Sequence, residues 1–164
     1  MRLELVLSIC GDSRVGKGTL IDKINYDEKG IRERFGIRGL PEFYATRKVT
    51  RSGKTVYRST EEMYENPSGC IVYRWQYKGD DEIARLLSFY PDVRHHIVLL
   101  WRPWNQHQCD LYQHPTSRHS ARAAWKKMIL PRFRKNGRLA KLGITIELVD
   151  ASKDLYTVMD WPEI

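Results

Sequence analysis

The sequence has few of the features that mark secreted, membrane or multidomain proteins. Only three of its 164 residues are cysteines, at positions 10, 70 and 109, and this odd, widely spaced set argues against a disulfide framework or a thiolate zinc site. No apolar run approaches the roughly 20 residues that cross a bilayer, and the first ten residues lack the charged and apolar regions of a signal peptide. Neither an internal repeat nor a Gly/Ser linker divides the chain. We therefore expect a single cytoplasmic domain over residues 1–164 with no membrane association.

Acidic residues are also scarce. The chain has 20 Asp and Glu against 28 Lys and Arg, which leaves a net charge of +8. No acid lies between Asp110 and Glu147, whereas nine basic residues do: Arg118, Arg122, Lys126, Lys127, Arg132, Arg134, Lys135, Arg138 and Lys141. Because hydrophobic residues make up 41% of the chain, a folded core is expected, and the excess positive charge should attract partners that carry phosphate.

Apolar segments of two kinds alternate along the chain. The run Leu3–Ile9 favours a strand buried on both faces, and Leu20, Ile21 and Ile24 recur at helical spacing within Lys17–Asn25. The same reasoning predicts strands at Phe43–Thr46, Cys70–Tyr77, His96–Trp101 and Gly143–Val149, and helices at Thr60–Glu65, Asp81–Tyr90 and Arg118–Arg134. Strands interleaved with helices indicate an α/β sandwich around a mainly parallel sheet.

A glycine-rich turn separates the first predicted strand from the first helix. Its spacing fits a phosphate-binding P-loop, in which backbone N–H groups and the positive end of the following helix face phosphates. The motif consists of Gly11, Asp12, Ser13, Arg14, Val15, Gly16, Lys17, Gly18 and Thr19. An ordinary strand-to-helix turn is the alternative, but the motif stands in the context that a P-loop requires. Lys17 would then reach the β- and γ-phosphates of a nucleotide.

The tetrapeptide Gly-Lys-Gly-Thr at residues 16–19 resembles the loop of adenylate kinases and related small-molecule kinases more than that of GTPases. The resemblance implies a three-layer P-loop NTPase sandwich of the nucleoside monophosphate kinase type, with ATP and Mg²⁺ as cofactors. Since Gly18 follows the lysine, the hydroxyl ligand for magnesium would be that of Thr19, with Asp12 as the nearest carboxylate. Ala151, after the last predicted strand, would border the adenine.

Residues 44–57 resemble the acceptor-phosphate segment of guanylate kinases, in which a Thr-Thr-Arg-x-Pro-Arg stretch precedes a glycine and a tyrosine. The resemblance implies an acceptor-binding insert at about residues 43–78, with Arg47, Arg51 and Tyr57 on the acceptor's phosphate. Arg74 stands where that family reads guanine with a glutamate, and a cation there suits a phosphate or a base carbonyl. A solvated charged loop is the alternative.

The basic stretch corresponds to a lid in related kinases, placed here at about residues 113–138. Lid arginines neutralise charge that develops on the transferred phosphoryl group. Arg118 and Arg122, four residues apart on a predicted helix, are the candidates for this catalytic role. An exposed basic helix without catalytic duty is the alternative.

These observations predict an ATP-dependent kinase that transfers the γ-phosphoryl group to a nucleotide. The acceptor would be a free nucleoside monophosphate or a nucleotide within DNA or RNA, such as a hydroxymethylated base in phage DNA. However, the segment Ile97–Arg102 ends without the carboxylate that would orient magnesium. A non-catalytic P-loop module that binds nucleotide or nucleic acid is therefore the alternative function.

Overall fold

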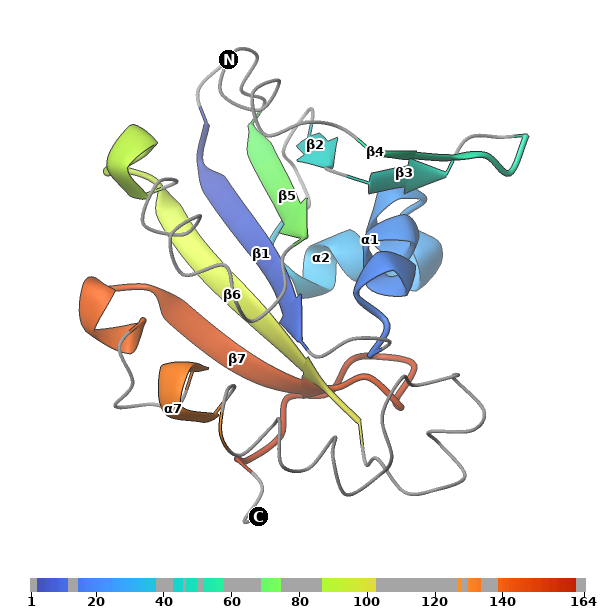
Figure 1. The fold of residues 1–164 in the computed structure, drawn as a ribbon. Coiled ribbons are helices and arrows are strands. Elements are labelled where there is room, and N and C mark those ends of the chain that lie inside the picture. The colour runs from blue at the N-terminus through green and yellow to red at the C-terminus, as the bar shows by residue number, and fades with distance from the viewer. Residues whose placement is uncertain are drawn as a thin grey trace.

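The computed structural model describes residues 3–11, 15–37, 43–45, 47–49, 52–57, 69–74, 87–102, 127, 130–133 and 139–161 (Figure 1). Five of the strands form one sheet in the order β2 (Phe43–Ala45), β5 (Cys70–Arg74), β1 (Leu5–Gly11), β6 (Arg94–Trp101) and β7 (Thr145–Asp150). All four neighbouring pairs in this sheet are parallel. The predicted α/β architecture with a parallel sheet is thereby confirmed.

Helices cover both faces of this sheet (Figure 1). Alternate residues of β1 belong to two separate hydrophobic clusters, because successive side chains of a strand point to opposite faces. Leu5, Leu7 and Ile9 pack with α1 (Lys17–Asn25) and α2 (Ile31–Arg34). Val6 and Cys10 lie in the other cluster, which includes Phe133 of α7 (Leu130–Phe133). Burial on both faces explains why β1 is almost uniformly apolar.

The helix predicted at Lys17–Asn25 has those bounds in the structure, whereas several strands are shifted by one or two residues. β6 begins at Arg94 instead of His96, because Arg94 pairs with Leu5 at the start of the β1 ladder. The strand expected from Gly143 begins at Thr145, because Gly143 adopts a left-handed conformation (φ 78°) that caps the 3-10 helix η3 (Ala140–Leu142). The predicted helix at Thr60–Glu65 lies outside the described residues.

Four short elements between β1 and β5 were not predicted: two strands, one 3-10 helix and the single turn α2. β3 (Arg47–Val49) and β4 (Thr55–Tyr57) form an antiparallel hairpin where the sequence indicated a charged loop, and β3 lies beside α1 (Figure 1). A 3-10 helix η1 (Glu28–Gly30) connects α1 to α2. Strands of three residues and single helical turns are too short to produce a recognisable period in the sequence.

Within the described part of the chain, no helix combines the length and the apolar character needed to cross a membrane.

Candidate functional site

The order of the strands by itself indicates at which edge of the sheet a ligand site is expected. From β1 the chain runs to β2 and β5 on one side of it, then crosses to β6 and β7 on the other side. The direction of winding thus changes between β1 and β6. In open α/β sheets, ligands bind at the carboxyl ends of the two strands that flank such a switch point. Gly11 ends β1 at this edge, and Val15 and Gly16 directly precede α1; these three residues are called the glycine loop here.

Two glycines of this loop occupy positions that other residues could not adopt without strain. Gly11, the last residue of β1, has a φ of +151°, and a Cβ there would lie 2.7 Å from Val15 Cγ1 and 2.9 Å from the Leu100 carbonyl oxygen. Gly16 has a φ of +110° and directly precedes α1. Positive φ values of this kind favour glycine, which has no Cβ. The glycine spacing of the motif therefore reflects the tight path of the backbone.

Lys17 is the first residue of α1, and its side chain folds back over the glycine loop. The residue is only 3% exposed, and its Nζ donates a hydrogen bond to the Gly11 carbonyl oxygen at 3.1 Å. A buried ammonium group is costly unless polar partners compensate it. Val15, which is 1% exposed, anchors the same loop in the core beside α1. Lys17 is therefore held at the amino end of α1, where the first N–H groups of a helix have no intrahelical acceptor.

Arg102 follows β6 directly and contacts the glycine loop from the neighbouring strand. Its Nε donates a hydrogen bond to the Val15 carbonyl oxygen at 3.1 Å, and its Nη2 lies 3.5 Å from the position that a Cβ on Gly16 would take. The guanidinium thus lies against the Val15–Gly16 peptide. Arg102 was not among the predicted site residues, because the segment that ends at this residue was distinguished only by its lack of a carboxylate. A basic residue directly after a buried strand is the signal that could have identified it.

Two other predicted site residues lie at this edge of the sheet. Arg74 is the last residue of β5, which pairs with β1 on the side opposite β6, in register with Ile9. Ala151 directly follows β7 and donates its backbone N–H to the Trp101 carbonyl oxygen at 2.9 Å. The carboxyl ends of β5, β1, β6 and β7 therefore bring Arg74, the glycine loop, Arg102 and Ala151 to one edge.

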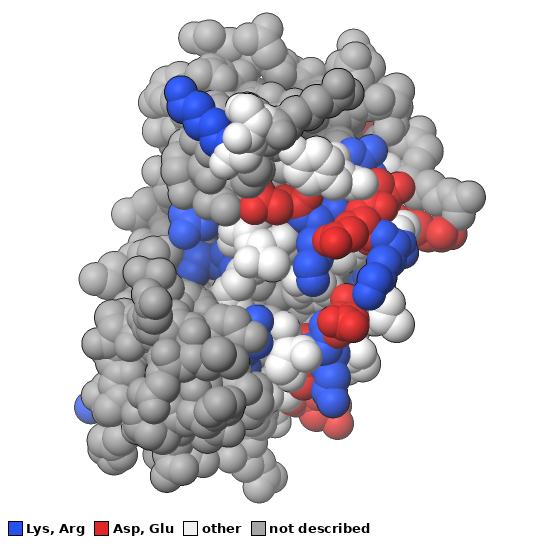
Figure 2. All heavy atoms as spheres, turned by 90° about the vertical axis from the view of Figure 1, so that its right-hand side faces the viewer, with Lys and Arg blue, Asp and Glu red and all other residues white. Residues whose placement is uncertain are grey.

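The fit of a magnesium ion can be tested on the described residues. Thr19 is exposed and lines a surface depression along α1 with Asp22, Lys23, Tyr26 and Glu28. Acidic and basic side chains are interspersed on the described part of the face that Figure 2 shows. The Asp150 carboxylate at the end of β7 accepts hydrogen bonds from the N–H and the hydroxyl of Ser152, at 2.9 and 2.5 Å. No group of three or more His, Cys, Asp or Glu among the described residues could hold a metal ion. A magnesium ion here would therefore depend on the phosphates of the nucleotide for most of its ligands, and the predicted ligand Asp12 lies outside the described residues.

The remaining predicted residues are placed only in part. Arg47 of β3 and Tyr57 of β4 are directly opposite each other in the hairpin, so the structure brings these two predicted acceptor residues together in register. The other predicted site residues lie outside the described part of the chain: Asp12, Ser13, Arg14, Arg51, Arg118 and Arg122.

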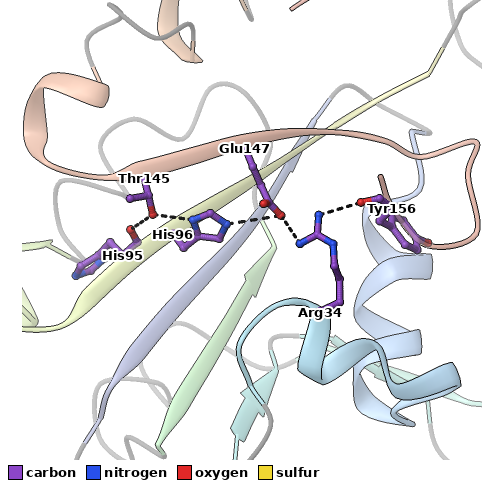
Figure 3. A network of polar contacts seen from close by, with 6 residues as sticks. All are labelled: Arg34, His95, His96, Thr145, Glu147 and Tyr156. Atoms are coloured by element: carbon purple, nitrogen blue, oxygen red, sulfur yellow. Dashed lines mark hydrogen bonds and ion pairs between the residues drawn. The ribbon is translucent and has the colours of Figure 1, made fainter. Parts of the chain in front are cut away.

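A second polar cluster joins α2 to β7 at the edge of the sheet (Figure 3). Arg34 donates from Nη1 to Glu147 Oε1 at 3.0 Å and from Nη2 to the Tyr156 carbonyl oxygen at 2.9 Å. His96 Nε2 lies 3.7 Å from the same carboxylate oxygen. Burial by itself would raise the pKa of Glu147, but the nearby His96 ring and the Arg34 guanidinium outweigh it, and the pKa is lowered overall. This cluster connects structural elements, and we assign it no ligand.

A scan against protein-family models finds no match for this chain, and a search of curated proteins finds no relative. Function therefore has to be inferred from the chemistry of the site itself.

Proposed function

We propose that this chain is an ATP-dependent phosphotransferase of the P-loop kinase type, which transfers the γ-phosphoryl group of ATP to a nucleotide acceptor. The observation that carries the proposal is the position of Lys17. Its ammonium group is buried, bonded to the Gly11 carbonyl oxygen, and located at the switch point of a parallel sheet. A lysine held at the amino end of α1, beside the end of β1, is placed where the helix N–H groups and its own ammonium can face the same phosphates.

The donor nucleotide would bind along the edge formed by β1, β6 and β7. Phosphate oxygens are stronger acceptors than a carbonyl oxygen, so the Lys17 ammonium would exchange its bond to Gly11 for bonds to the β- and γ-phosphates. The backbone N–H groups at the start of α1 would contact the same oxygens. The turn at Ala151 would border the base. Phosphoryl transfer then requires mainly alignment of the two substrates and screening of the negative charge.

The acceptor would be anionic and would approach from the β5 side of β1. Arg74 lies at that end of the sheet, and Arg47 and Tyr57 are paired in the hairpin beside α1. Arg51 and the lid arginines Arg118 and Arg122 complete the proposed set. The net charge of +8 is compatible with a free nucleoside monophosphate, or with a nucleotide in DNA or RNA such as a hydroxymethylated base.

The direct test is transfer of labelled phosphate from γ-labelled ATP to a panel of nucleoside monophosphates and of single- and double-stranded DNA. We expect Lys17→Ala to lower transfer by roughly 100-fold or more, the cost of removing one donor that stabilises the transition state. Lys23→Ala is the matched control, because Lys23 lies on the same helix but contacts the Tyr156 ring. Both variants are checked for thermal unfolding. Unchanged transfer in Lys17→Ala would disprove the proposal.

One observation favours a second function. β6 is followed by Arg102, and the strand-end carboxylate that usually orients the metal of a P-loop NTPase is not there. A non-catalytic module would bind ATP in the same loop and label no acceptor. Equilibrium binding of ATP, measured beside the transfer assay, separates these two functions.

A further inference from the structure

The end of β6 places a permanently charged side chain on the glycine loop. A guanidinium group keeps its charge at every physiological pH, and its five N–H donors diverge in one plane. The bond from Arg102 Nε to the Val15 carbonyl oxygen fixes this plane against the loop, at 3.1 Å. The Nη2 atom of Arg102 lies near Gly16, which directly precedes Lys17, the first residue of α1. Lys17 and Arg102 thus each donate a hydrogen bond to a carbonyl oxygen of the glycine loop, at Gly11 and Val15 respectively.

This arrangement reverses the charge usually found at one metal-holding position of a P-loop, the end of a strand next to the loop. In P-loop NTPases a loop hydroxyl and a strand-end aspartate hold Mg²⁺, which in turn neutralises the phosphates. Here the residue after β6 is Arg102, while the loop hydroxyl is that of Thr19, two residues after Lys17. An aspartate attracts the ion, whereas an arginine repels the ion and attracts the phosphates directly.

We propose that Arg102 is a second cation of the phosphate site, and that it allows the chain to bind the polyphosphate of a nucleotide without a divalent metal ion. The inference rests on the proposed function, since it concerns the same loop. The planar fork of the guanidinium matches the spacing of phosphate oxygens. The Val15 bond orients the fork before the ligand arrives, so little side-chain entropy is lost on binding.

The test is isothermal titration of the full chain with inorganic tripolyphosphate, in excess Mg²⁺ and again in EDTA. The inorganic probe contains no base or sugar, so it reports the phosphate site alone. We expect the affinity in EDTA to lie within about tenfold of the affinity in Mg²⁺, a difference of about 1.4 kcal/mol or less. A requirement for the metal, with binding lost in EDTA, would overturn the inference.

Substitutions of Arg102 then test the residue itself in EDTA. Arg102→Leu is expected to weaken binding roughly 10- to 100-fold, the range for a hydrogen bond to a charged group. Arg94→Leu is the matched control, because this substitution removes the same charge. Arg94 is exposed and lies at the opposite end of β6. Equal affinities of these two variants would overturn the inference.

The dependence of binding on salt distinguishes direct contact from a purely structural role through Val15. Loss of a cation that touches the ligand should reduce the slope of log Kd against log salt concentration, because dissolved ions then screen one fewer ionic contact between protein and ligand. Arg102→Lys, which keeps the charge, should retain the slope. If both Arg102 variants lose affinity with an unchanged slope, Arg102 acts only on the loop and the inference is wrong.

Lys17→Ala distinguishes failure of the inference from failure of the proposed function. Weakened binding in Lys17→Ala with full binding in Arg102→Leu would leave the kinase proposal standing and reject the role of Arg102. Binding of tripolyphosphate that neither substitution affects would reject both proposals.

Discussion

Replacing Gly11 by alanine tests whether the tight path of the glycine loop is a requirement of the fold. The added Cβ would lie 2.7 Å from Val15 Cγ1 and 2.9 Å from the Leu100 carbonyl oxygen, and the second of these atoms belongs to the backbone of β6. Overpacking of a core typically costs about 1 to 3 kcal/mol. A φ of +151° adds roughly 1 to 3 kcal/mol for a residue that carries a Cβ. We expect Gly11→Ala to lower the free energy of unfolding by roughly 2 to 4 kcal/mol, since partial relaxation reduces the sum.

Urea denaturation followed by tryptophan fluorescence measures this loss, and Gly143→Ala is the control. Gly143 also has a positive φ, +78°, but nothing lies within 4 Å of the Cβ that would be added. This variant therefore carries only the cost of the left-handed conformation, about 1 to 2 kcal/mol, and no steric clash. Gly11→Ala should also weaken tripolyphosphate binding, because Val15 would have to move. A Gly11→Ala protein as stable as Gly143→Ala would refute the steric reasoning.

Three further predictions concern titratable groups outside the glycine loop. The pKa of Glu147 in the folded protein is lowered from its ordinary 4.5. The ionised Glu147 carboxylate therefore stabilises the fold fully above pH 4.5, and this stabilisation is lost as the pH falls through the lower pKa of the folded state. Glu147→Gln should therefore cost roughly 1 to 2 kcal/mol at pH 7 and almost nothing in strong acid, as measured by urea titrations across pH. Burial lowers the pKa of His95 from 6.5 despite its hydrogen bond to the Tyr90 carbonyl, so the folded state loses stability as the pH falls below 6.5. His95→Gln should flatten the slope of stability against pH in that range, and an unchanged slope would contradict the assignment. Burial raises the pKa of the Cys70 thiol to about 12, so iodoacetamide at pH 8 should label Cys70 in urea but not in the native protein, as mapped by peptide mass spectrometry.

The parts of the fold that the sequence predicted well are those where local pattern and tertiary packing agree. β1 is a continuous apolar run because both of its faces are buried, and α1 has apolar residues at helical spacing on the side that faces the sheet. The β3–β4 hairpin lacked such a pattern, since its strands contain three residues each and carry Arg47 and Lys48. The pairing of β6 with the first residues of β1 also could not be predicted, because register depends on contacts distant in sequence.

The candidate site likewise contains residues that the sequence identified and one residue, Arg102, that it did not. Gly11, Gly16 and Lys17 could be identified as candidates from the sequence because their spacing within one short segment is typical of a phosphate-binding turn. Arg102 is 87 residues from its partner Val15 and reaches it only because β6 pairs with β1 in parallel. A local motif therefore identifies the loop, and the topology of the sheet supplies the second cation.

The large positive charge of the chain does not by itself produce a phosphate site. Most exposed lysine and arginine side chains are flexible, and each one that is immobilised on a ligand costs roughly 0.5 to 1.5 kcal/mol of conformational entropy. Lys17 and Arg102 differ because each already donates a hydrogen bond to a carbonyl oxygen of the same loop, Gly11 and Val15 respectively. Their positions are set before any anion binds. We therefore expect these two of the 28 basic residues to account for binding of the donor phosphates, while basic residues outside the proposed donor and acceptor sites contribute mainly to long-range attraction.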